Sequence, residues 1–213
     1  MKTIEERKKI AKIMIKKLKE LIPEAKTALN YSTPWELLMA VILSAQTTDK
    51  TVNKVTETLF KKYKNVDAVA QANLEEFTQD IHSVNFYRNK AKNIIATAKI
   101  IQEKYKGKVP DTMEELLNLP GVARKTANVI LSIIYDKAEG VVVDTHVRRL
   151  SNLHGLTDSQ DPVKIEKDLV EILPKEEWRD FSFRMIDYGR QFCPARPHDH
   201  DKCPITVALQ SIK

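Results

Sequence analysis

Glycine is scarce in this chain, with 5 glycines among 213 residues, beside 9 prolines. So few turn-forming residues argue against an all-β protein, which needs many tight turns. The glycines also form neither a GxGxxG nor a GxxxxGK[ST] pattern anywhere in the sequence. A dinucleotide-binding loop or a P-loop of the usual kind is therefore excluded.

Long apolar segments are missing as well. The longest uncharged stretch, around Leu37–Thr48, is shorter than the ~20 apolar residues of a membrane-spanning helix. Near the start, Lys12, Lys16 and Lys17 interrupt any apolar core of a signal peptide. We therefore expect an intracellular protein, in the cytoplasm or nucleoid, without a membrane partner.

The composition that remains is that of a folded helical protein. Apolar residues make up 42% and charged residues 30% of the chain, and its 24.4 kDa suggests one or two domains. Apolar residues follow a helical period almost throughout, and the only strand-like stretch is Val141–Val143. The pattern predicts an all-α fold of about ten helices. The net charge of +6 permits a polyanionic partner.

The strongest local motif is Leu119-Pro120-Gly121-Val122-Ala123-Arg124-Lys125-Thr126-Ala127. It predicts a short helix, a tight hairpin at Gly121 and a second helix. Such a hairpin presents backbone N–H groups beside a helix N-terminus, which suits a DNA phosphate. An ordinary turn between two helices is the alternative.

Lys125 lies opposite the apolar stripe Ala127, Ile130, Leu131 and Ile134 of the second predicted helix. Its side chain should therefore point away from the core. It also stands in the first turn, where the helix dipole disfavours a cation. A nucleophilic amine is one interpretation, and a plain surface lysine is the other.

Asp144 precedes Thr145-His146-Val147-Arg148 and is predicted to be a helix N-cap. A carboxylate held by helix N–H groups can also take part in catalysis, so the two roles are compatible. His146 is expected to be structural or to support the site. Arg148 and Arg149 are either phosphate contacts or part of a solvated face.

In these motifs the chain resembles the helix-hairpin-helix DNA glycosylase superfamily, specifically its endonuclease III branch. The likeness covers nearly the whole chain. Four stretches carry it in the family's order: Leu43–Asp49 (LSAQTTD), Phe86–Ala91 (FYRNKA), Leu119–Ala127 (LPGVARKTA) and Val143–Arg148 (VDTHVR).

This resemblance implies two helical domains with a DNA-binding cleft between them. One domain, about residues 27–137, would be a six-helix bundle that ends in the hairpin helices. Residues 1–26 together with 138–213 would form the other. In the cleft Lys125 would face Asp144.

The resemblance also implies a function: a bifunctional DNA glycosylase and AP lyase of base excision repair, acting as a monomer on oxidised pyrimidines in double-stranded DNA. Lys125 would be the nucleophile and Asp144 its acidic partner. The alternatives are a monofunctional mismatch thymine or adenine glycosylase and a non-catalytic DNA-binding protein. The implied DNA contacts are Gln46, which would fill the gap left by a flipped base, Phe86, which would wedge into the opposite strand, and Leu119, Gly121, Val122, Ala123, Arg124 and Arg148.

Three features depart from the family pattern. Ala123 stands where the hairpin usually has a second glycine, and Asn85-Phe86 replaces a glycine followed by an aliphatic residue. The family's iron–sulfur pattern, C-x6-C-x2-C-x5-C, falls here on Cys193, His200, Cys203 and Leu209. Since Leu209 has no donor atom, we expect no cluster, no other cofactor and a remnant loop. Zinc held by Cys193, His198, His200 and Cys203 is the alternative.

Overall fold

The computed structural model describes residues 2–210, and within this range the chain forms helices and no β-strand. The predicted all-α class is confirmed. The chain divides into two compact units, Thr27–Lys137 and the pair of segments Met1–Lys26 and Ala138–Lys213. None of the helices between residues 2 and 210 is long and apolar enough to cross a membrane.

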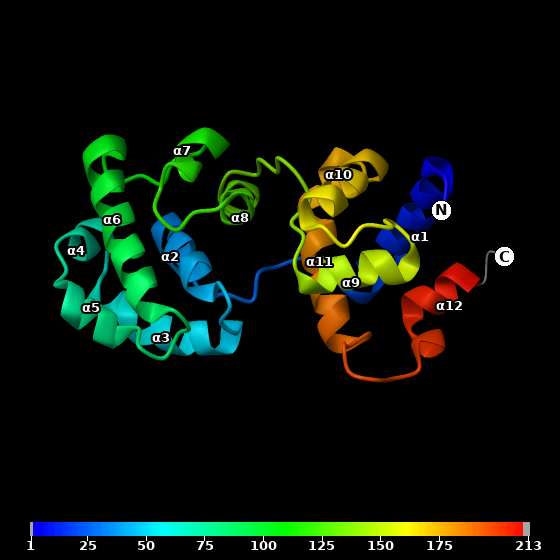
Figure 1. The fold of residues 1–213 in the computed structure, drawn as a ribbon, viewed down its shortest axis with the longest axis horizontal. Helices are drawn as coiled ribbons and strands as arrows, with labels where there is room; N and C mark the ends of the chain where they lie inside the picture. Colours follow the sequence, from blue (N-terminus) through cyan, green and yellow to red (C-terminus); the bar gives the residue numbers. More distant parts are fainter. Residues whose placement is uncertain (1, 211–213) are drawn as a thin grey trace. The chain divides into compact units, whose positions relative to one another are not determined.

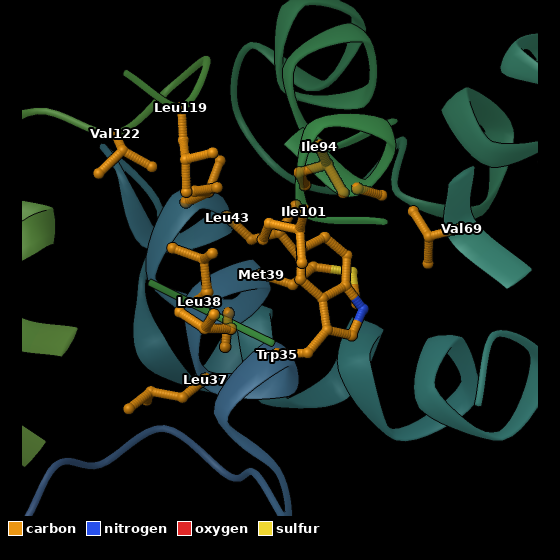
Figure 2. Close-up of a cluster of buried hydrophobic side chains, with 14 of the residues drawn as sticks. Trp35, Leu37, Leu38, Met39, Leu43, Val69, Ile94, Ile101, Leu119 and Val122 are labelled. Atoms are coloured by element: carbon orange, nitrogen blue, oxygen red, sulfur yellow. The ribbon is translucent and has the colours of Figure 1, made fainter. Parts of the chain in front are cut away.

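The Thr27–Lys137 unit is built around one buried helix, α2, which packs against α3, α6 and α8. Leu37, Leu38 and Leu43 of α2 are completely buried, each contributing about 1.5–3 kcal/mol by burial. Figure 2 shows them in the core cluster with side chains from α4, α6 and the hairpin. The helices of the unit are α2 (Pro34–Ser44), α3 (Asp49–Lys62), α4 (Val66–Ala70), α5 (Leu74–Asp80), α6 (Tyr87–Tyr105), α7 (Met113–Leu117) and α8 (Arg124–Ile134).

Helix α4 was not predicted, because its five residues are too few to show a helical period. The stretch predicted to hold six helices therefore holds seven. The cap predicted at Thr33-Pro34 is present: the Thr33 hydroxyl accepts from the Glu36 amide, and Pro34 fills the first helical position. This cap fixes where the buried helix begins.

In the other unit, α11 packs against both α1 and α9, and α12 packs against α1. The unit joins the two ends of the chain, so its core combines residues far apart in sequence, such as Met14, Leu18, Leu150 and Tyr188. Its helices, seen in Figure 1, are α1 (Ile4–Leu21), α9 (Thr145–His154), α10 (Pro162–Ile172), α11 (Trp178–Gln191) and α12 (Pro204–Gln210), with short 3-10 turns at Lys175–Glu177 and His200–Lys202.

Arg184 of α11 ties the end of α1 into this unit. Its guanidinium is buried and donates from Nε to the Ile22 carbonyl at 3.0 Å. It also pairs with Asp180 at 3.1 Å on the same helix. A buried arginine with carbonyl and carboxylate partners keeps its charge satisfied, so α1 is held by polar as well as apolar contacts.

Candidate functional site

The hairpin between α7 and α8 is attached to α6 by contacts that leave no room for a side chain at its turn. Gly121 has φ +80°, a region that residues with a Cβ atom rarely adopt. A Cβ atom built there would lie 3.1 Å from Cβ of Asn93 in α6. One turn further along α6, Thr97 Oγ1 donates to the Pro120 carbonyl at 2.8 Å. Glycine is thus required for both conformation and space.

Two of the residues predicted to contact DNA at the hairpin are part of the core instead. The side chains of Leu119 and Val122 are 2% and 7% exposed, and Figure 2 shows them in the buried cluster beside α2. Gly121, Ala123 and Arg124 are exposed. Leu119 and Val122 therefore support the turn, and their own N–H groups donate to the carbonyls of Leu116 and Leu119.

Helix α8 begins at this turn without a side-chain cap. Its N-cap residue is Ala123, which offers no oxygen to the first N–H groups of the helix. Thr112, by contrast, caps α7 with its hydroxyl, and Asp144 caps α9 with its carboxylate. An uncapped N-terminus leaves N–H groups for an outside acceptor such as a phosphate.

Lys125 lies in the first turn of α8 with its side chain exposed. The core side of the helix is formed by Ala127, Ile130 and Leu131, all buried, so the amine points away from the core as the helical phase predicts. It makes no hydrogen bond or ion pair with any residue that the structure describes. The amine is accessible to an electrophile.

Asp144 is the N-cap of α9, as predicted. Its Oδ1 accepts from the Val147 amide at 2.8 Å, and the residue is half-buried. Because one oxygen is fixed by the helix N-terminus, the carboxylate has a defined orientation. The cap therefore places a carboxylate at the start of α9.

His146, two residues further along, packs against α11. A Cβ atom built on Gly189 would approach its Nδ1 to 2.5 Å, so the imidazole occupies the space that a side chain there would need. Burial lowers the pKa of His146, while the negative charge of Asp144 raises it and so opposes that shift. The ring is thus a packed neighbour of Asp144.

Gln46 and Phe86 lie in two loops that contact each other. Both residues have left-handed backbones, with φ of 55° and 57°. Asn85 connects the loops: its side-chain amide donates to the Gln46 carbonyl, and its backbone N–H donates to Thr47 Oγ1 at 3.1 Å. We call residues 45–48 and 84–86 the loop pair. The Phe86 side chain is 62% exposed at the start of α6, where a wedge would have to be.

Lys90 of α6 binds the first loop of the loop pair through its side-chain amine. It was not predicted to be a site residue. Its Nζ donates to the carbonyls of Leu43 and Ala45 at 2.7 and 2.6 Å and to Thr47 Oγ1 at 3.2 Å. The side chain is only 6% exposed, and burial lowers its pKa. Three oxygen acceptors match the three N–H groups of an ammonium. The buried amine therefore fixes the backbone on both sides of Gln46.

The two arginines of α9 differ. Arg148 is exposed, and its guanidinium has no partner within residues 2–210. Arg149 turns toward the C-terminal part of its unit, where its guanidinium donates to the Cys193 carbonyl and lies 3.8 Å from the Cys193 sulfur. Only Arg148 remains as a candidate phosphate contact.

The prediction that the protein carries no metal or cofactor is wrong. Residues 192–203, which we call the tail segment, gather four metal-ligand side chains: Cys193, His198, His200 and Cys203. Their ligand atoms all lie within 4.8 Å of one another. The prediction failed because it took Leu209 as the fourth position, whereas the turn of the chain brings in His198, the residue named in the zinc alternative. Leu209 packs against the core of its unit.

Comparison with known proteins identifies one family of DNA repair proteins. Residues 39–175 match the model of the HhH-GPD superfamily base excision DNA repair proteins. The endonuclease III of Synechocystis sp. is 51% identical over 179 residues, which cover 84% of this chain and 82% of that protein. The endonuclease III of Bacillus subtilis is 45% identical over 190 residues, covering 89% and 86%.

Solved structures agree with this result. A trapped covalent intermediate of an endonuclease III with DNA, in an estranged-adenine complex, superposes with a TM-score of 0.87 at 39% identity, covering 100% of both chains. A non-covalent complex of an endonuclease III with DNA gives 0.88 at 39% identity, covering 100% of this chain and 99% of that one. A thermostable thymine-DNA glycosylase shares the fold, with a TM-score of 0.77 at 21% identity.

Proposed function

The chain belongs to the HhH-GPD superfamily of base excision DNA repair proteins, and we propose that Lys125 and Asp144 carry its chemistry. The protein is a bifunctional DNA glycosylase and AP lyase. The single observation that supports the assignment of Lys125 is the exposed, unpartnered amine in the first turn of the hairpin helix. A trapped covalent complex of a structural relative with DNA fits a nucleophile of this kind.

The reaction starts with the Lys125 amine and the sugar of a damaged nucleotide. Nζ forms a bond to C1′ while the bond from C1′ to the base breaks, and the base leaves with the bonding electron pair. Asp144 stabilises the positive charge that develops on the sugar or takes a proton from the attacking amine. Opening of the sugar ring gives a Schiff base. Loss of a proton from C2′ then expels the 3′ phosphate by β-elimination.

A base stacked in a duplex is out of reach of a lysine, so the nucleotide must first be flipped out. We propose that Gln46 enters the vacated space and that the exposed Phe86 ring wedges into the opposite strand. Both residues have left-handed backbones. The Asn85 side chain binds the Gln46 carbonyl, and Lys90 binds the carbonyls of Leu43 and Ala45, which precede Gln46. A loop that is already fixed loses little further entropy when it enters DNA.

The hairpin and Arg148 would bind the phosphate backbone. The uncapped start of α8, the exposed residues Gly121, Ala123 and Arg124, and the Arg148 guanidinium supply N–H donors and positive charge. The substrate is double-stranded DNA with an oxidised pyrimidine, and the protein acts on it as a monomer. We expect it to work where the genome lies, in the cytoplasm at the nucleoid.

Borohydride trapping tests the assignment of Lys125. The protein is mixed with a duplex carrying an abasic site or thymine glycol, and reduction of the Schiff base should give a stable protein–DNA crosslink. Lys125→Ala should lose the crosslink and strand nicking, while Lys104→Ala, which removes an exposed lysine of α6, should retain both. A full crosslink with Lys125→Ala would place the nucleophile elsewhere.

A second variant separates the roles of Asp144. Asparagine caps a helix as well as aspartate does, so Asp144→Asn should keep the fold of α9. Base removal should slow by about 100-fold or more, since an acid–base or charge-stabilising group is lost.

Release of adenine opposite oxidised guanine by the wild-type protein, with no action on oxidised pyrimidines, would assign the protein to the mismatch glycosylases instead.

A further inference from the structure

We propose that Cys193, His198, His200 and Cys203 bind one zinc ion in a tetrahedral site, which fixes the tail segment to α11 and holds α12 against α1. All four residues come from an 11-residue stretch of the chain between α11 and α12. The proposal concerns a structural site in the unit that does not contain Lys125.

The spacing of the donor atoms carries the argument. The Cys193 sulfur lies 3.5 Å from Nδ1 of His200, and the Cys203 sulfur lies 3.2 Å from Nε2 of His198. With bonds of about 2.0–2.3 Å to nitrogen and sulfur, a tetrahedral zinc ion places its ligand atoms about 3.3–3.8 Å apart. A four-iron cluster would hold its outer ligands farther apart, because four metal atoms and not one stand between them. These two distances fit one ion, and all four ligand atoms lie within 4.8 Å of one another.

The donor set also differs from the iron–sulfur pattern of the family. Cys193, His200 and Cys203 occupy three of the four pattern positions, and Leu209 occupies the fourth. The structure packs Leu209 against the core of its unit and supplies the fourth donor from His198, which lies outside the pattern. Two thiolates and two imidazoles are a common ligand set for structural zinc.

Hydrogen bonds outside the four donors orient them as a metal site requires. His198 uses Nδ1 to donate to the Arg196 carbonyl at 2.8 Å, which leaves the lone pair of Nε2 directed toward the site. A bond of this kind from the second ring nitrogen accompanies most metal-binding histidines. The Arg149 guanidinium donates toward the Cys193 sulfur at 3.8 Å and so helps to fix its position.

Burial supports a structural role. Cys193 and Cys203 are 0% and 3% exposed, and four protein donors leave no open position for water or substrate. Cys193 lies two residues beyond the end of α11, and Cys203 directly precedes α12. One ion bound to both therefore joins these two helices. The buried Ile205 of α12, whose amide donates to the Tyr188 hydroxyl of α11 at 3.1 Å, completes the contact.

The test measures metal in the full-length protein, purified without oxygen and without added metal. We expect one zinc per chain by mass spectrometry, a colourless solution and two thiols that react only after chelation. Replacement of zinc by Co²⁺ should give the intense visible bands of a tetrahedral ion with sulfur ligands. About four irons with inorganic sulfide, no stoichiometric metal, or a Cys193–Cys203 disulfide would each overturn the proposal.

His198 gives the sharpest variant, because it is a ligand in this proposal and not a position of the iron–sulfur pattern. Loss of an outer hydrogen-bond partner costs about 10- to 100-fold in metal affinity, and loss of a ligand should cost more. His198→Ala should therefore weaken zinc binding by over 100-fold, while the matched control His82→Ala, an exposed histidine of the other unit, should not change it. Unchanged affinity in folded His198→Ala protein would also overturn the proposal.

Discussion

The loop pair in one unit and the tail segment in the other are each organised around a cation. In the loop pair it is a lysine amine, and in the tail segment it is the metal ion that we propose. Around the loop pair the cation is the amine of Lys90, which donates to three oxygens. In the tail segment two sulfurs and two nitrogens converge, and their ligand atoms lie within 4.8 Å of one another. Oxygen acceptors suit an ammonium, whereas sulfur and imidazole donors suit a transition metal.

This difference predicts different behaviour. A cation that belongs to the chain is present whenever the chain folds, so the loop pair depends only on the protein. A metal ion must be supplied and can be removed, so the tail segment should respond to chelators, acid and metal supply. The parts proposed to enter DNA are thus the ones that need no cofactor to be ordered.

The largest effect should come from removing a metal ligand. Cys203→Ala leaves Cys193 and two histidines without a closed site, and we expect the free energy of unfolding to fall by about 4 kcal/mol, in the range for loss of a metal. Thermal unfolding with and without chelator measures it. The chelator should destabilise the wild-type protein and leave Cys203→Ala unchanged. Equal chelator sensitivity in both would show that the metal binds elsewhere.

Replacing Lys90 should have the next largest effect. Lys90→Met keeps the apolar stem and leaves the Leu43 and Ala45 carbonyls without their donor, which costs about 1–3 kcal/mol for each buried group left unpaired. We expect a loss of about 3 kcal/mol in denaturant unfolding that does not depend on chelator. Lys92→Met, on the exposed side of the same helix, should change stability little. An equal loss of stability in both variants would show that Lys90 contributes no more than another lysine of the same helix.

Acid should have a smaller effect on stability, through His154 in the unit that contains the tail segment and not through the loop pair. Burial lowers the pKa of His154, beside His200, Lys2 and Arg149, to about 4 from its ordinary 6.5. In this pH range the unfolded chain binds a proton at His154 that the folded chain does not bind. The free energy of unfolding therefore falls as the pH drops from 6.5 toward 4. At pH 5 the loss is about 2 kcal/mol, from 1.36 kcal/mol per pH unit.

Cys203→Ala protein isolates this effect from metal release, and adding His154→Leu should flatten its pH profile between pH 6.5 and 4. The loss caused by Lys90→Met should be the same at pH 7 and pH 5, because the three oxygens that accept from the amine favour its charged form. An equally steep profile with His154→Leu would assign the acid sensitivity to other groups.

Local patterns in the sequence predicted the parts of the site that depend on neighbouring residues. The helical phase of Ala127, Ile130 and Leu131 was sufficient to place the Lys125 side chain outside the core. The Asp144 cap followed from its position before α9. Both predictions rest on periods of a few residues, which the chain fixes by itself.

The features that were missed depend on contacts between distant residues or on the path of a loop. Lys90 binds oxygens 43 to 47 residues earlier in the chain, and a lysine in a polar stretch gives no sign of such burial. His198 was named only in the zinc alternative; it meets the other three ligands because of how the segment turns, whereas the iron–sulfur spacing had pointed to Leu209. Neither arrangement follows from a local period.

Hydrogen exchange of the full-length protein, with and without chelator, compares the two regions in one experiment. The amides of Cys193, Cys203 and Ile205 should exchange much faster when the metal is removed, since their bonds depend on the fixed tail segment. The amides of Thr47, Asn85 and Lys90 should keep their protection. Unchanged protection of the tail amides, or a loss of protection in both regions together, would contradict the account.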